Sequence, residues 1–279
     1  MSETEHVVEL PSAKPIYPPG VPCWVDALVP EPRAAATFYS AVLGWEFAER
    51  ASTPDGGEYL LARLGGDDVA GMVSLPDAST HPHWATYVRV DELETALQRA
   101  ADAGGTVIVA PLDARPAGRV GVVADPLGAT IGLWEPHARE GAQRINEPGA
   151  WAMSTLRTPD LDRAERFYAN AFGWTGQPFD VGMVLFRLDG YVGGLPQQPV
   201  PRDVVAVGVE VNDLRQAQWS VEFWIDDLPA AVERATRHGA HVIAPPFDAG
   251  LFRRAVIADP AGAVFTLSQL LRERLVSGT

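Results

Sequence analysis

Residues 38–45 read "FYSAVLGW" and residues 167–174 read "FYANAFGW". Both stretches begin with the pair Phe-Tyr and end with Gly-Trp. Two further pairs follow in the same order: "ADAGGTVIVAPLDA" (101–114) matches "TRHGAHVIAPPFDA" (236–249), and "ADPLGATIGLWEP" (124–136) matches "ADPAGAVFTLSQL" (258–270). A period of about 130 residues is too long for a solenoid unit. The sequence therefore predicts a duplicated domain.

Hydrophobic periodicity gives each half the same pattern of a strand, a helix and several short strands, used twice. In the first half we expect helices at 33–42 and 93–103. Expected strands lie at 24–29, 46–50, 59–64, 69–75, 84–90, 107–109, 119–124 and 130–134. Gly44 and Gly173 suit a left-handed residue that ends a helix. The repeated Phe-Tyr pair, Phe38 and Tyr39 or Phe167 and Tyr168, is predicted to face the core.

The repeat and the turn residues together predict five segments. A proline-rich arm covers 1–20, the first domain 21–137, a linker 138–149, the second domain 150–271 and a tail 272–279. The stretch 197–219 is longer than its counterpart in the first half. We expect it to be a loop that determines specificity.

Composition excludes several classes of protein. The chain of 279 residues has a net charge of −14, so its field repels nucleic acid and anionic lipid. No run of about 18 apolar residues occurs, and the first residues are acidic and proline-rich, so neither a membrane span nor a signal peptide is indicated. We expect a cytoplasmic protein. The single cysteine, Cys23, excludes an internal disulfide and is expected to be a small buried residue.

The repeated motifs carry a resemblance to a known family. "FYSAVLGW" after a "PEP" turn, the helix entries "VDEL" and "IDDL", and "ADPLGA" or "ADPAGA" before a last strand resemble the vicinal oxygen chelate superfamily. This superfamily includes glyoxalase I, extradiol dioxygenases, and bleomycin- and fosfomycin-resistance proteins. The closer resemblance is to its tandem glyoxalase-like, or hydroxylase-like, branch in high-GC bacteria. It implies an α+β fold of two tandem domains, each made of two βαβββ modules whose curved mixed sheet surrounds a cup for a small molecule.

Strand alternation predicts which residues face each cup. In the first half these residues are Trp24, Asp26, Leu28, Tyr87, Arg89, Gly132 and Trp134. In the second half they are Met153, Thr155, Arg157, Ser220, Glu222, Trp224, Thr266 and Ser268.

The resemblance also implies positions for a metal ion, which needs converging nitrogen or oxygen donors. Those positions hold Trp24, Ala85 and Gly132 in the first half and Met153, Ser220 and Thr266 in the second. A further position falls near Gly71 in the first half and near Gly193 or Gly194 in the second. None is a usual ligand, so no metal and no other cofactor are expected. His81 and His83 lie together in "HPHW" and keep a two-histidine site open as an alternative.

The remaining side chains expected to line the cups are aromatic or polar. The indoles of Trp24, Trp134 and Trp224 are placed to sandwich a planar ligand, or else to fill the cup. Asp26 near Arg89, and Glu222 near Arg157, are candidate acid or base residues with a cationic anchor. The alternative is an ion pair without chemistry.

Three functions stay open. The first is metal-independent binding of a small apolar or aromatic metabolite, with sequestration as in the resistance members. The second is a metal-independent acid/base enzyme of specialised metabolism, such as an isomerase, a cyclase or a hydroxylase-like protein. The third is a metal-dependent lyase or dioxygenase. A protein partner at residues 10–22 is a weaker fourth alternative. We expect a monomer with two pseudo-symmetric domains, or a homodimer.

Overall fold

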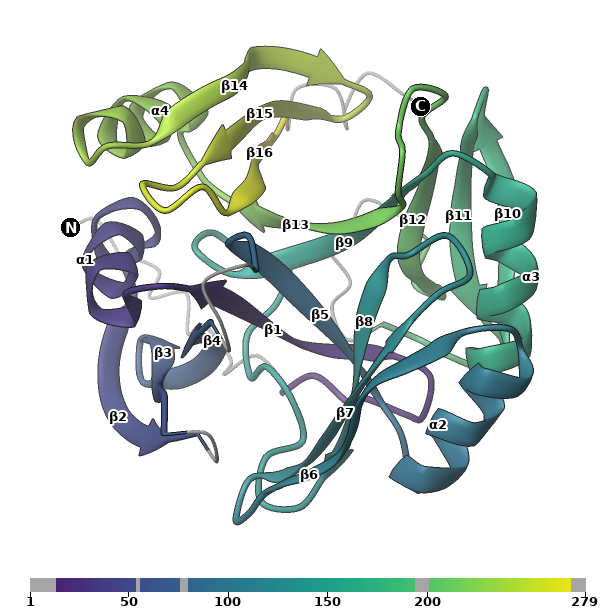
Figure 1. Cartoon of the computed structure of the whole chain (residues 1–279). Coiled ribbons are helices and arrows are strands. Elements are labelled where there is room, and N and C mark those ends of the chain that lie inside the picture. The colour runs from purple at the N-terminus through teal and green to yellow at the C-terminus, as the bar shows by residue number, and fades with distance from the viewer. Residues whose placement is uncertain (1–13, 54–55, 76–79, 194–200, 272–279) are drawn as a thin grey trace, which may run out of the picture.

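The computed structural model describes residues 14–53, 56–75, 80–193 and 201–271. The first half forms one eight-stranded sheet in the order β2-β3-β4-β1-β5-β8-β7-β6, with two helices (Figure 1). Its elements are β1 (Pro22–Val29), α1 (Pro32–Leu43), β2 (Glu46–Ser52), β3 (Glu58–Leu64), β4 (Asp67–Ser74), β5 (His83–Arg89), α2 (Leu93–Asp102), β6 (Thr106–Ala114), β7 (Gly118–Ala124) and β8 (Thr130–Pro136).

The second half repeats this order as β10-β11-β12-β9-β13-β16-β15-β14. The predicted α+β architecture of two tandem domains, each made of two βαβββ modules, is confirmed. The elements are β9 (Trp151–Thr158), α3 (Leu161–Phe172), β10 (Trp174–Asp180), β11 (Met183–Leu188), β12 (Val204–Glu210), β13 (Gln218–Trp224), α4 (Leu228–Arg237), β14 (His241–Ala249), β15 (Phe252–Ala258) and β16 (Val264–Leu270).

One expectation about the second half is wrong. The stretch 197–219 is not a single loop, because it contains β12, which pairs with β11 and in parallel with β9. Its sequence, "VVAVGVE", is a valine-rich run of the kind that favours a buried strand. Residues 194–200 and the tail 272–279 lie outside the described residues, as does most of the arm.

The helices begin and end as their sequences predict. Pro32 occupies the first turn of α1, where its missing N–H costs nothing. Gly44 ends α1 and Gly173 ends α3, each with φ of 76°. Within the described residues, no helix is long and apolar enough to cross a membrane.

The two repeated motifs bind each other across the domains. The Trp84 Nε1–H donates to the Tyr39 hydroxyl at 3.0 Å, and that hydroxyl donates to Asp259 of the other domain at 3.1 Å. The equivalent residues of the second domain form the same pair of hydrogen bonds. Trp219 Nε1–H donates to the Tyr168 hydroxyl at 2.9 Å, and that hydroxyl donates to Asp125 of the first domain at 3.1 Å. The tyrosine of each "FY" pair is thus bonded to the aspartate of the other half's "ADP" turn.

The tryptophans that close the two repeated phrases are exchanged in the same way. Trp45 of the first domain donates to the Gly149 carbonyl, at the entry to the second, at 2.7 Å. Trp174 of the second domain donates to the Gly20 carbonyl, at the entry to the first, also at 2.7 Å. Gly20 and Gly149 have positive φ, and a side chain at either would meet a backbone carbonyl of the opposite domain.

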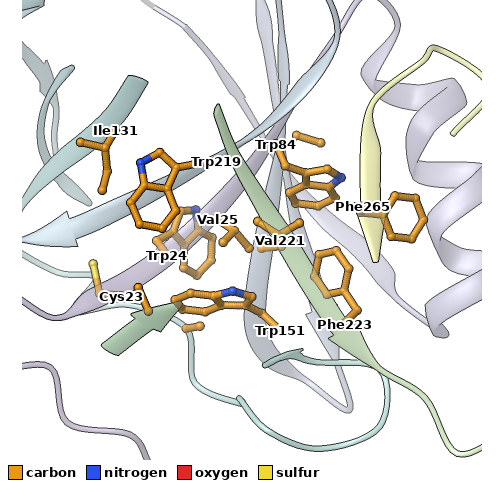
Figure 2. Packing of buried hydrophobic residues seen from close by; sticks show 14 of the residues in the cluster. Cys23, Trp24, Val25, Trp84, Ile131, Trp151, Trp219, Val221, Phe223 and Phe265 are labelled. Atoms are coloured by element: carbon orange, nitrogen blue, oxygen red, sulfur yellow. The ribbon is translucent and has the colours of Figure 1, made fainter. Parts of the chain in front are cut away.

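A shared aromatic core fills the space between the domains (Figure 2). Phe223 of β13 lies 5.0 Å from Trp84 and 5.4 Å from Trp45, both of the first domain. Phe265 of β16 packs 5.5 Å from Tyr39. In Figure 1, α1 lies beside α4 and α2 beside α3, so the helices also pair across the domains. The helix-facing sides of both sheets are therefore buried against each other, and the opposite sides carry the residues that were predicted to line the cups.

Candidate functional site

The first cup is the concave face of the first sheet, defined by residues that share register with Asp26. Asp26 pairs with Gly71 and Ala85, and Tyr87 pairs with Gly132, which in turn pairs with Val122. Side chains in register lie on one face of a sheet. The half-buried apolar and aromatic residues of this face are Leu28, Tyr59, Val73, Tyr87, Val120, Val122 and Trp134.

A buried carboxylate lies at the floor of the first cup. Asp26 is 7% exposed, and its Oδ1 accepts from Trp24 Nε1 at 2.8 Å and from the Tyr59 hydroxyl at 3.0 Å. Burial raises the pKa of Asp26, and hydrogen bonds from Trp24, Tyr59 and Tyr87 oppose that rise. Burial also raises the pKa values of both phenols, so they remain neutral donors. Asp26 is thus a carboxyl group surrounded by neutral donors.

Two glycines make room for this cluster. A methyl group at Gly71 would overlap the carboxylate of Asp26 and the hydroxyl of Tyr59. A methyl group at Gly132 would overlap the ring of Tyr87. Gly118 gives the same clearance to the ring of Trp134. The first cup is therefore shaped by large side chains that lie over glycines, where a side chain would leave them no room.

The connector, residues 137–150, includes the predicted linker 138–149 and lies against the first domain. His137 and Arg139 donate backbone N–H groups to the Ala117 carbonyl, each at 3.0 Å. Further along, Ala142 N–H donates to the Cys23 carbonyl at 2.8 Å and Gln143 N–H to the Asp68 carbonyl at 2.7 Å. The connector therefore runs from the β6–β7 turn to the start of β1 and β4, along one end of the first cup.

Arg139 is the connector residue that reaches the first cup. Its guanidinium lies 5.4 Å above the ring of Trp24, and its Nε lies 3.5 Å from Asp68 Oδ2. Asp68 is also bound by Arg63 at 2.9 Å. The positive charge of Arg139 lowers the pKa of Asp26, against the larger effect of burial.

The second cup, the concave face of the second sheet, has a different polar group. Glu222 is 7% exposed and pairs with Arg254 of β15, whose Nε lies 3.1 Å from Oε2. The guanidinium of Arg254 lies 5.2 Å above the ring of Phe252, which packs 5.9 Å from Trp224. Glu222 is in register with Met153 and Thr266. This carboxylate is therefore neutralised by a cation from its own sheet.

Register places most predicted site residues on the expected faces, but the two predicted ion pairs are wrong. Arg89 lies at the end of β5, where it pairs with Asp91 at 2.6 Å and approaches Glu140 at 4.0 Å. Arg157 is exposed, and Arg254 takes its predicted place beside Glu222. The residues that share the first face are Trp24, Asp26, Leu28, Tyr87, Arg89, Gly132 and Trp134. Those in register on the second face are Met153, Thr155, Arg157, Ser220, Glu222, Trp224, Thr266 and Ser268.

Of the two roles predicted for Trp24, its burial favours the one in which the indole fills the cup. The residue is 5% exposed, Arg139 lies over its ring, and its Nε1 donates to Asp26. Tyr59, Arg139 and Arg254 are not among the residues predicted from the sequence. Alternation along β3 and β15 was a signal for Tyr59 and Arg254, but residue 139 belongs to no strand or helix, and no pattern indicated it.

The residues of the cups do not fit a metal ion. One oxygen of Asp26 accepts hydrogen bonds from two neutral donors, and Glu222 forms an ion pair with Arg254. The space over Gly71 and Gly132 is filled by Tyr59, Asp26 and Tyr87. His83 turns its Nδ1 toward the His81 carbonyl at 2.9 Å. Within the described ranges, no three His, Cys, Asp or Glu residues converge; Gly194 lies outside those ranges.

Comparison with known proteins agrees with this architecture. The sequence model of the glyoxalase-like domain matches twice, at residues 23–133 and 137–268. The chain belongs to the glyoxalase-like family of the vicinal oxygen chelate superfamily. "Putative glyoxylase CFP32" of Mycobacterium tuberculosis is 33% identical over 260 residues, which cover 90% of this chain and 95% of that protein. "Anthracycline biosynthesis protein DnrV" of Streptomyces peucetius is 31% identical over 268 residues, covering 91% and 94%.

Solved structures of the superfamily share the fold of this family member. The Mn(II)-bound glyoxalase from Novosphingobium aromaticivorans superposes with a TM-score of 0.63 at 14% identity, over 92% of this chain and 84% of that one. The 2,3-dioxygenase LapB from Pseudomonas sp. KL28 gives 0.62 at 13% identity, over 89% and 91%. At these identities the likeness concerns the fold alone, and the resemblance predicted from the motifs is confirmed at that level.

Proposed function

We propose that this glyoxalase-like protein binds a planar, largely apolar metabolite in its first cup, without a metal ion. The observation that carries the proposal is the composition of that cup. Half-buried Leu28, Val120, Val122 and Trp134 offer an apolar surface, and the Asp26 cluster offers a polar floor. A mainly apolar wall with a few convergent polar groups is the usual composition of a small-molecule site.

The relatives support the ligand class. Two of them, DnrV and "Anthracycline biosynthesis protein DauV" of Streptomyces sp., carry names that refer to anthracycline biosynthesis. Fused-ring compounds of that kind are planar and mostly apolar, with oxygen atoms at their edges. The ligand we propose is therefore a fused-ring aromatic compound that contacts Trp134 and the valines and places one polar edge near the Asp26 cluster.

Filling one cup at a time tests this proposal. Val122 and Val256 hold equivalent positions, because Val122 pairs with Gly132 and Val256 with Thr266; both are half-buried. The probes are anthraquinone-2-carboxylate and its neutral carboxamide, followed by tryptophan fluorescence and calorimetry. Val122→Trp should weaken binding of both probes by about tenfold or more, since an indole occupies the cup, which is a loss of about 1.4 kcal/mol. Val256→Trp should not. The proposal would be overturned if the wild-type protein bound neither of the two probes.

A second candidate function is proton transfer by Asp26, as in an isomerase or cyclase. The observation that favours it is that burial raises the pKa of this carboxyl, which neutral donors hold on the face of the first cup, since such groups suit general acid/base catalysis. Uptake of deuterium by 2-tetralone, an aromatic ketone with acidic C–H bonds, measures this activity by NMR. Asp26→Asn should abolish the uptake while leaving probe binding intact. Deuterium uptake at the wild-type rate in the presence of Asp26→Asn would show that Asp26 is not the proton-transfer group. Recovery of a chemically unchanged ligand with the protein from cells would favour sequestration of that ligand over catalysis.

A further inference from the structure

The arginines around the first cup differ in how fully they are paired. Arg144 pairs with Asp67 at 2.9 Å and with Glu147 at 3.1 Å, and Arg119 pairs with Glu94 and Glu135. Among the residues that the structure describes, Arg139 by contrast has a single, loose ion-pair contact of 3.5 Å with Asp68, a carboxylate that Arg63 already binds at 2.9 Å. A guanidinium offers five N–H donors. Arg139 therefore has donors to spare for another acceptor.

The position of Arg139 places its guanidinium beside the Asp26 cluster of the first cup. Its side chain is 21% exposed, so it is held in place yet still open to a ligand. The guanidinium lies over the face of Trp24, whose Nε1–H binds Asp26. The backbone carbonyl of Arg139 accepts from Trp134 Nε1 at 2.8 Å. Residue 139 is thus bonded to one aromatic residue of the cup and stacked on another.

We propose that Arg139, supplied by the connector, is the ligand-binding residue that selects compounds with an anionic oxygen at the edge of the ring system. This inference rests on the proposed function, and it narrows the substrate class to aromatic acids, phenolates or enolates. The oxygen accepts from Arg139 while the rings lie against Trp134 and Val122. An ionised acceptor forms a stronger hydrogen bond with a guanidinium than a neutral one does.

The whole protein carries a net charge of −14, which opposes the approach of an anion. Selection of an anionic ligand therefore needs a local cation whose charge is not fully neutralised. Arg139 meets that need, because two guanidinium groups share the one carboxylate of Asp68. Its stacking on Trp24 keeps the guanidinium in position before a ligand arrives, which reduces the entropy lost on binding.

The test compares two probes of the same shape, anthraquinone-2-carboxylate and its carboxamide, in three proteins. The wild-type protein should bind the carboxylate about tenfold more tightly than the carboxamide. Arg139→Gln should abolish this preference by weakening the carboxylate alone. Arg144→Gln, a change in the same connector, should keep it. Arg139→Gln is expected to fold, because the hydrogen bond from residue 139 to Ala117 and the one from Trp134 to residue 139 both involve the backbone of residue 139.

The outcomes separate this inference from the proposed function. Equal affinities of the wild-type protein for the two probes, or an unchanged preference in Arg139→Gln, would overturn the role of Arg139 while binding in the cup stands. Arg139→Lys should retain part of the preference, because it keeps the charge and loses the planar donor pair. If the wild-type protein binds neither probe, the proposed function fails and this inference falls with it.

Discussion

Two glycines and one aspartate determine what the first cup can hold. Gly71 and Gly132 lie where the resemblance implied metal ligands, and the space above them is taken by side chains from neighbouring strands. Asp26 reaches into that space and is bonded to an indole and to phenols. Asp26 is thus a buried carboxyl that has no cation in direct contact with it among the described residues. Its charge state should be reflected in the stability of the protein.

We expect the stability difference between Asp26→Asn and the wild-type protein to depend on pH. Because burial raises the pKa of Asp26 in the folded state, its contribution is fully present below the ordinary aspartate pKa of about 3.9 and is lost as pH rises through the raised value. The asparagine does not titrate. The free energy of unfolding of the variant, relative to the wild-type protein, should therefore rise with pH in urea titrations. The exposed Asp213→Asn is the control; a difference that stays constant with pH would contradict the assignment.

Individual helices and strands follow from local sequence, whereas their partners do not. Alternation along β1 and β5 assigns Val25, Ala27 and Val88 to a buried face, and all are fully buried. Gly44 and Gly173 end their helices with positive φ as expected. The hydroxyl of Tyr39 gives no such signal, since its acceptor, Asp259, lies 220 residues away. Local patterns show that a side chain is buried; they do not show what it contacts.

The bond between Tyr168 of α3 and Asp125 of the opposite domain can be measured by a double-mutant cycle. Tyr168→Phe and Asp125→Asn each change one partner, and the coupling energy reports the pair itself. We expect a coupling of about 1 kcal/mol, because the bond is buried and 3.1 Å long. The same cycle on Tyr39 and Asp259 should give a similar value, since the two pairs are related by the repeat. Coupling energies near zero would show that the bonds do not join the domains.

At the scale of the whole molecule, the duplication was predictable but the way the copies join was not. Matching stretches of sequence showed two domains, and the resemblance implied a cup in each. The ion pairs predicted within the cups are wrong because they joined neighbouring strands. Glu222 of β13 pairs instead with Arg254 of β15, two strands away, and the cation that lies over Trp24 beside Asp26 is Arg139 of the connector. Such contacts depend on sheet order and on loop paths, which one sequence does not reveal.

The shared core predicts that both domains unfold together. Phe223 is fully buried and packs on Trp45 and Trp84 of the first domain. Phe223→Ala should lower the free energy of unfolding by about 3–5 kcal/mol. Calorimetry should still show one transition for the entire chain. The matched change Phe247→Ala, at a residue that is 43% exposed, should have a small effect. Two separate transitions, with only one shifted by Phe223→Ala, would contradict a common core.

The exchange of tryptophans and tyrosines between the halves also has a consequence during synthesis. The ribosome releases β1 to β8 long before β13 and β16, so Trp45, Trp84 and Tyr39 have no cover while the second half is being made. Contacts that join residues so distant in the chain form late, and apolar surface left open in the meantime favours aggregation. The nascent first half is therefore the stage at which this chain exposes the apolar surface of its shared core, and a slow stretch of translation after Pro136 would lengthen that exposure.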